Sequence, residues 1–124
     1  MFDTDYTSRS LRDLKKIIGG SAEVDALMKR KFAALEKIDM EHAVIIKHIK
    51  LVRGISSEIS ESLSKNGFDP CVYEYRDFPR KYPYRVYFVK KNKTLLILRV
   101  FRHREIKNKL AKTLLKSIKE EILK

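Results

Sequence analysis

The spacing of apolar residues changes at Gly67 of this 124-residue chain. Before Gly67, apolar residues recur every three or four positions, which is typical of helices with one buried face. Gly19-Gly20 and Gly54 interrupt this pattern, and Ser21 and Asp39 are suitable caps for the helices that follow them. The predicted helices cover residues 8–18, 22–38, 40–53 and 55–65.

Beyond Gly67, polar and apolar residues alternate in three segments rich in Tyr, Phe and branched aliphatic residues, as in strands. The predicted strands cover residues 72–78, 84–90 and 94–101. Lys91-Asn92-Lys93 is the expected hairpin connection, and the last strand is nearly continuous in apolar residues, so we place it inside the sheet. A weaker pattern around Tyr6 suggests a fourth strand at the edge.

Helical spacing returns from about Glu105 to the end of the chain. The apolar stripe of this segment consists of Ile106, Leu110, Leu114, Leu115, Ile118 and Ile122. We expect this C-terminal helix, residues 105–124, to pack on the core; covering a partner or supporting a homodimer are the alternatives. The whole pattern predicts one α+β domain, residues 1–124, with an antiparallel three- to four-stranded sheet packed against N-terminal helices and an extra C-terminal helix.

Charge is distributed unevenly along the chain, whose formal net charge is +12. Residues 1–62 hold 11 Lys and Arg against 10 Asp and Glu, whereas the remainder holds 17 against 6. A basic surface confined to one part of a protein is typical of proteins that bind a polyanion: nucleic acid, an acidic protein or an anionic membrane. A basic surface without a partner is the alternative.

Several classes of site are absent from the sequence. Cys71 is the single cysteine, which excludes an internal disulfide and a cysteine-rich zinc site and is compatible with a cytoplasmic location. His42 and His48 are six residues apart, a spacing that does not make a metal pair on one helix face. We therefore expect no metal and no cofactor. No apolar run is long enough for a transmembrane helix, so no membrane association is expected.

Arg85 lies early in the second predicted strand, where side chains alternate between the two faces of the sheet. If Val86 faces the helices, Arg85 and Tyr87 face away from them, on a sheet face that we expect to be open. An arginine held by a strand can bind a phosphate with two hydrogen bonds. A cross-strand ion pair with Glu74 or Asp77 is an equally good interpretation.

Arg102, His103 and Arg104 follow the last predicted strand directly. Histidine exchanges protons near neutral pH, and arginines beside it can neutralise a phosphate. This combination suits RNA cleavage by the 2′-hydroxyl group, with His103 as acid or base, Arg85 and Arg104 on the phosphate, and Glu74 or Tyr87 as a second titratable group. A surface histidine at the end of a strand is the alternative.

Tyrosines alternate with cations between residues 73 and 87. Single-stranded nucleic acid is bound by such surfaces, because bases stack on aromatic rings while phosphates pair with cations. Arg76, Arg80, Lys81, Tyr87 and Arg102 are the candidate RNA contacts. The alternative is that most of the tyrosines are ordinary strand residues with the ring in the core.

At these residues the chain resembles the RelE/ParE superfamily of toxins from bacterial toxin–antitoxin systems. The resemblance rests on Tyr84-Arg85-Val86, the charged hairpin turn, residues 95–100 and the basic exit containing His103. Residues 72–76 resemble the preceding strand of that family, and residues 9–16 resemble its first helix. Two departures are the helical insertion over residues 39–63 and a long C-terminal helix without the family's tyrosine near the chain end.

The resemblance implies a toxin that cuts mRNA at the ribosome without a metal, and that a cognate antitoxin protein keeps silent. Arg85 would stand where the family places a strand arginine, and Arg102, His103 and Arg104 where it places basic or histidine residues. Relatives of ParE type poison DNA gyrase on the same scaffold, and this remains an alternative. A basic module that binds nucleic acid or a protein partner without catalysis is the third possibility.

Overall fold

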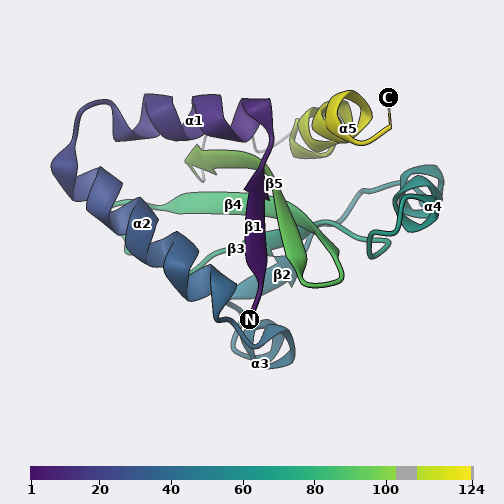
Figure 1. The fold of residues 1–124 in the computed structure, drawn as a ribbon, viewed down its shortest axis with the longest axis horizontal. Helices are drawn as coiled ribbons and strands as arrows, with labels where there is room; N and C mark the ends of the chain where they lie inside the picture. Colours follow the sequence, from purple (N-terminus) through teal and green to yellow (C-terminus); the bar gives the residue numbers. More distant parts are fainter. Residues whose placement is uncertain (103–108, 124) are drawn as a thin grey trace.

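The computed structural model describes residues 1–102 and 109–123, which form an α+β fold around one five-stranded sheet (Figure 1). The strands are β1 (Asp3–Tyr6), β2 (Ile49–Leu51), β3 (Tyr73–Tyr75), β4 (Tyr84–Lys91) and β5 (Thr94–Arg102). The helices are α1 (Ser8–Ile18), α2 (Ala22–Glu36), α3 (Met40–Ile45), α4 (Ser57–Lys65) and α5 (Leu110–Glu121). The strand order in the sheet is β1-β5-β4-β3-β2.

The α+β class is confirmed, while the sheet is larger than predicted and is mixed. β1 is the edge strand expected near Tyr6, and it lies parallel to β5. The other neighbours are antiparallel, and β5 is internal as predicted. Asn92, with a φ of 54°, forms the tight turn between β4 and β5, and asparagine tolerates this left-handed conformation well.

The predicted helix over residues 40–53 is wrong in its second half. α3 ends at Ile45, and Ile49–Leu51 form the edge strand β2 instead. Ile49 is completely buried in this strand, and Lys50 pairs in register with Glu74 of β3. The sequence pattern could not show this, because β-branched residues suit strands and the partner strand lies more than twenty residues further along the chain.

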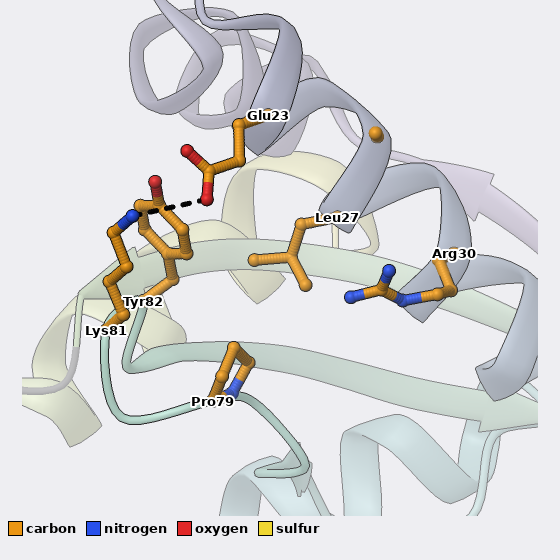
Figure 2. Close-up of a pocket in the computed structure, with 7 residues that line it drawn as sticks. Glu23, Leu27, Arg30, Pro79, Lys81 and Tyr82 are labelled. Atoms are coloured by element: carbon orange, nitrogen blue, oxygen red, sulfur yellow. Dashed lines mark hydrogen bonds and ion pairs between the residues drawn. The ribbon is translucent and has the colours of Figure 1, made fainter.

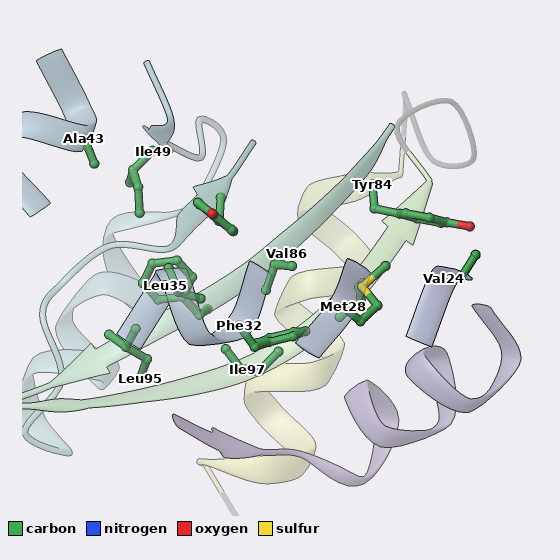
Figure 3. Packing of buried hydrophobic residues seen from close by; sticks show 13 residues of the cluster. Val24, Met28, Phe32, Leu35, Ala43, Ile49, Tyr84, Val86, Leu95 and Ile97 are labelled. Carbon is green, nitrogen blue, oxygen red and sulfur yellow. The ribbon is translucent and has the colours of Figure 1, made fainter. Parts of the chain in front are cut away.

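One face of the sheet, here called the first face, carries α1 and α2. Val86 and Phe88 of β4 point to this side and pack with Met28, Phe32 and Leu35 of α2 (Figure 3). The predicted N-caps are confirmed, since Ser21 accepts a hydrogen bond from Val24 N and Asp39 accepts one from His42 N. Thr7 caps α1 in the same way by accepting a hydrogen bond from Ser10 N.

The opposite face, here called the second face, is covered by α4 and α5 (Figure 1). Ile59 and Leu63 of α4 and Leu114 and Ile118 of α5 pack there against the residues of β4 and β5 that point away from α2. The expectation of an open sheet face is therefore wrong over this region, whereas the expectation that the C-terminal helix packs on the core is confirmed for residues 110–121.

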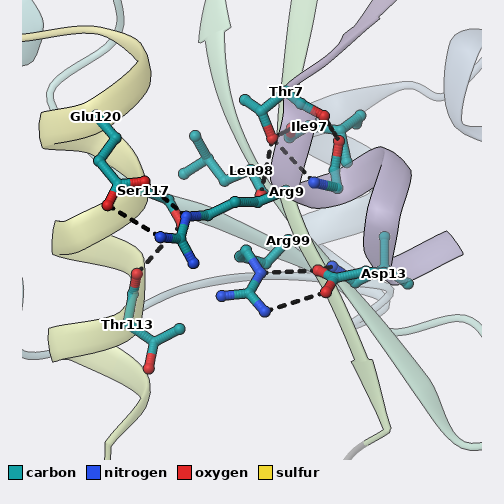
Figure 4. Close-up of polar contacts among 11 residues, drawn as sticks. Thr7, Arg9, Asp13, Ile97, Leu98, Arg99, Thr113, Ser117 and Glu120 are labelled. Carbon is teal, nitrogen blue, oxygen red and sulfur yellow. Dashed lines mark hydrogen bonds and ion pairs between the residues drawn. The ribbon is translucent and has the colours of Figure 1, made fainter. Parts of the chain in front are cut away.

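A bidentate ion pair fastens α5 to α1 (Figure 4). Arg9 donates from Nε and from one terminal nitrogen to the two carboxylate oxygens of Glu120, at 2.7 and 2.9 Å. This hydrogen bond from Arg9 lowers the pKa of Glu120. The contact joins residues 111 positions apart in the chain.

α1 closes the edge of β5 beyond the point where β1 ends. The last residue pair between β1 and β5 is Tyr6 with Ile97, so Val100 has no strand neighbour on that side. Asp13 of α1 accepts a hydrogen bond from Val100 N at 3.0 Å and two from the Arg99 guanidinium at 2.8 and 3.0 Å (Figure 4). One carboxylate therefore satisfies a backbone donor and a cation at the strand edge.

Replacing Asp13 by alanine should lower the free energy of unfolding by about 1–3 kcal/mol, because Val100 N and the half-buried Arg99 lose their acceptor. Chemical denaturation followed by circular dichroism measures the effect. Asp25→Ala is the matched control, because among the described residues Asp25 pairs only with the exposed Lys29 on the same helix. It should change stability by less than about 0.5 kcal/mol. Equal effects of the two substitutions would refute the role given to Asp13.

Candidate functional site

Strand register brings the predicted cations to one end of the sheet. Tyr75 pairs with Val86, and Tyr84 pairs with Arg102. The end of β3, the start of β4 and the end of β5 therefore lie together. We call this region the basic end of the sheet, and its predicted members are Arg76, Arg80, Lys81, Arg85 and Arg102.

Arg85 and Glu74 form an ion pair on the second face at this end. Arg85 Nε lies 3.0 Å from Glu74 Oε1, and both side chains are only 13% exposed. Glu74 also lies 3.6 Å from Arg76 Nε, so one carboxylate is shared by two arginines. Of the two acidic partners that the sequence offers for Arg85, the structure has Glu74. Asp77 lies instead beside Lys31, at 3.3 Å.

The hydrogen-bonding capacity of Arg85 is incompletely used by the described residues. One terminal nitrogen donates weakly to the carbonyl of Tyr84 at 3.3 Å. Nε is buried and makes no hydrogen bond with any described residue, although Glu74 is close, because the direction of its N–H does not suit that oxygen. The pair is thus held by charge and proximity, and the guanidinium retains donors for another acceptor.

Tyr87 lies on the same face but is closed to solvent. It is 6% exposed and packs against Phe101, with ring centroids 6.0 Å apart. Burial raises the pKa of the Tyr87 hydroxyl well above its ordinary value, so the group is protonated at neutral pH. A base cannot stack on this ring, and Tyr87 therefore has no part in the RNA contacts that we propose below.

Lys81 and Arg102 belong to the other side of the basic end. Lys81 turns toward α2 and lies 3.3 Å from Glu23 Oε1 (Figure 2). Arg102 pairs in register with Tyr84, whose ring belongs to the core of the first face. Arg80 is exposed in the loop between β3 and β4. The predicted RNA contacts are thus divided between the two faces rather than gathered around Arg85.

The predictions for His103 and Arg104 fall on residues outside the described part of the chain. In the sequence these two residues follow Arg102, the last residue of β5, directly. Arg102 is exposed at the basic end of the sheet.

Two surface hollows flank the basic end on the side of α1 and α2. The first, here called the α2 hollow, has a volume of about 330 Å³ and is lined by Glu23, Ala26, Leu27, Arg30, Pro79, Lys81 and Tyr82 (Figure 2). The second, here called the β5 hollow, has a volume of about 480 Å³ and is lined by Asp13, Lys16, Ile17, Tyr84, Arg99, Val100, Phe101 and Arg102.

Sequence analysis did not single out Lys16, Arg30 or Arg99 for these surfaces. Lys16 and Arg30 belong to helices, where a charged residue is normally a solvated one. Arg99 is half-buried and stacks over the Phe101 ring at 4.4 Å while it binds Asp13. The one usable clue is that Arg99 interrupts an otherwise apolar strand, which requires a partner for its charge.

No family model, curated protein or solved structure matches this chain. Within residues 1–102 and 109–123, no cluster of three metal-ligating side chains occurs. No helix in that same part of the chain is long and apolar enough to cross a membrane.

Three buried or partly buried tyrosines should make the fold sensitive to alkali. Burial raises the pKa of Tyr75 to about 12 and places those of Tyr73 and Tyr87 still higher. The folded state then holds protons that the unfolded chain releases near pH 10, so stability should fall as pH rises above about 10. Tyrosinate absorbance measured with circular dichroism during an alkaline titration tests this prediction.

The matched variant for that titration is Tyr87→Phe. The tyrosinate absorbance that develops before unfolding comes from exposed tyrosines, so the substitution should leave it unchanged. The further increase in absorbance on unfolding should be smaller, because Tyr87 no longer contributes to it. Loss of absorbance from the folded phase would show instead that the Tyr87 hydroxyl is accessible.

Proposed function

We propose that this protein is a toxin of RelE/ParE type that acts as a metal-independent endoribonuclease on mRNA at the ribosome. The observation that carries the proposal is the placement of Arg85. It is held on a strand beside Glu74, at the end of the sheet where β5 leads into His103 and Arg104. The antiparallel hairpin of β4 and β5 and the first helix, α1, are elements that the resemblance led us to expect, and they support the proposal.

In the proposed reaction the RNA supplies its own nucleophile. The 2′-oxygen attacks the adjacent phosphorus, a 2′,3′-cyclic phosphate forms, and the bond from phosphorus to the 5′-oxygen breaks. His103 takes the proton from the 2′-hydroxyl or gives one to the leaving 5′-oxygen, and Glu74 is the candidate for the complementary proton transfer. Arg85 and Arg104 stabilise the negative charge that develops on the phosphate.

RNA binding at Arg85 would alter the ion pair between Arg85 and Glu74. Without RNA, Glu74 offsets part of the positive charge of Arg85 and Arg76 in a site that excludes most water. A phosphate that approaches Arg85 would compete with Glu74 for the guanidinium of Arg85.

The gyrase poison is the second candidate, and one observation favours it. α4 and α5 cover much of the second face, and Glu74, the candidate carboxylate of the site, is engaged by two arginines. A toxin that only binds its target needs no carboxylate that is free to transfer protons.

Inducible expression in a bacterial host separates the candidates. Growth should stop, and primer extension on abundant messages should show new 5′ ends within translated regions. Arrest with intact messages and a DNA-damage response would move the assignment to gyrase. Normal growth would favour the third possibility, a non-toxic basic module that binds nucleic acid or a protein partner.

A further inference from the structure

The two hollows at the basic end lie on either side of a pair of stacked tyrosines. Tyr82 lines the α2 hollow and Tyr84 lines the β5 hollow, and their rings are nearly parallel with centroids 6.5 Å apart. We propose that this surface, from Lys16 and Arg102 past the tyrosines to Arg30 and Lys81, binds single-stranded RNA, with one base in the α2 hollow. The inference rests on the proposed function in taking RNA as the ligand.

The α2 hollow combines an apolar floor with a polar rim. Leu27 is 4% exposed, yet it belongs to neither of the two core clusters and points into the hollow beside Pro79 (Figure 2). The aromatic side is Tyr82, and the rim carries Glu23, Arg30 and Lys81. Its volume of about 330 Å³ is at the small end of ligand pockets and suits one nucleotide.

Glu23 gives the α2 hollow a means to distinguish bases. The Tyr82 hydroxyl and the Lys81 ammonium group lower the pKa of Glu23, so its carboxylate is ionised at neutral pH and only accepts hydrogen bonds. A carboxylate accepts from the exocyclic amino group of cytosine, whereas uracil presents a carbonyl oxygen at the same position. The hollow should therefore prefer cytosine over uracil.

The β5 hollow supplies cations for the adjoining phosphates. Lys16 and Arg102 are exposed, and neither forms an ion pair within the described part of the chain. Arg99 is held by Asp13, whose carboxylate offsets its charge, so it is not among the proposed phosphate contacts. Tyr84 is buried, so Tyr82 is the ring on which a base can stack, and cations on both sides of such a ring suit a single strand.

Binding can be measured separately from cleavage with 2′-O-methyl oligonucleotides, which lack the nucleophile. Fluorescence anisotropy with the full-length protein should show tighter binding of a C-rich than of a U-rich oligonucleotide of equal length. Affinity should fall steeply with salt, and Arg30→Ala should flatten the logarithmic salt slope by about 0.7, the value for one phosphate contact on a single strand.

Two further variants test the base contact. Tyr82→Leu keeps apolar bulk but removes the ring, and it should weaken binding about 10-fold. Glu23→Gln should reduce the preference for cytosine. Lys29→Ala is the control for Arg30→Ala, because Lys29 is an exposed cation of the same helix that lines neither hollow, and it should leave the affinity unchanged.

Wild-type affinity in both Arg30→Ala and Tyr82→Leu would overturn the inference, as would competition by polyglutamate that is as strong as competition by RNA. If cleavage occurs while these variants bind normally, the proposed function stands and the binding surface lies elsewhere. If the variants lose binding but the wild-type protein cleaves no message, the binding surface stands and the nuclease assignment fails.

Discussion

Arg85→Ala should reduce cleavage of RNA by about 10²- to 10³-fold, the usual cost of removing one group that stabilises transition-state charge. The reason is its position: the side chain is 13% exposed, fixed on β4, and next to the only carboxylate that we assign to the reaction. Cleavage rates with purified protein and growth arrest in cells should both show the loss. Arg85→Lys should restore part of the activity, since it keeps the charge and loses the fork of donors.

The same substitution has a structural effect that must be measured beside the rate. Removing Arg85 leaves a half-buried Glu74 with only Arg76 at 3.6 Å, and breaking such a pair costs about 3–5 kcal/mol. Combining Arg85→Met with Glu74→Met should recover stability but not activity. Arg53→Ala, an exposed arginine that lines neither hollow, is the matched control and should change neither quantity. An Arg85→Ala protein that is folded and fully active would show that Arg85 does not take part in the reaction.

Leu114→Ala should lower the free energy of unfolding by about 2–5 kcal/mol, because it opens a cavity in the core of the second face. Leu114 has no exposed surface, and it packs with Ile118, Leu63 and Leu98 between α5, α4 and the sheet. Leu11→Ala is the matched control, since Leu11 lies on a helix but is 54% exposed. Chemical denaturation of both variants provides the comparison.

The result for Leu114 decides whether α5 is a stable part of the folded core or a helix that leaves the sheet readily. A large loss for Leu114 and a small one for Leu11 would identify α5 as part of the folded core. Equal, small losses would indicate that α5 leaves the sheet readily in solution, and the second face around Arg85 would then be open to a partner.

The sequence pattern was sufficient for the elements whose partners are near in the chain or whose periodicity is strong. The hairpin of β4 and β5 was predicted almost to the residue, because alternation and the turn at Asn92 act together. α1 and α2 were predicted from their apolar stripes and from the caps at Ser21 and Gly19. Local chemistry determines these elements.

Contacts between distant segments determine what the pattern missed. β2 is a strand because it pairs with β3, with Lys50 opposite Glu74. A short apolar run is compatible with either a helix or a strand, so the sequence alone did not predict this pairing. The parallel pairing of β1 with β5 joins residues about ninety positions apart. Coverage of the second face depends on α4 and α5 meeting there, which amphipathic spacing in two separate helices does not specify.

The candidate site shows the same division. Alternation placed Arg85 and Tyr87 on the face away from α2, as the structure has them, but it left open whether Arg85 meets Glu74 or Asp77. The sequence also suggested that Lys81, Arg102 and Arg85 bind the same RNA at one site. In the structure, the loop before β4 and the strand register direct Lys81 and Arg102 to the first face instead. Lys16 and Arg30 became candidates only when the fold placed their helices beside the basic end.

The chemical form of the RNA ends tests the central claim most directly. Messages from translating cells or from a translation reaction that contains the purified protein should be cut to give 2′,3′-cyclic phosphate and 5′-hydroxyl ends, and the His103→Ala protein should give none above background. Ends that carry 5′-phosphate, or messages that stay intact while growth stops, would contradict the account of this protein as a nuclease that uses the 2′-hydroxyl group.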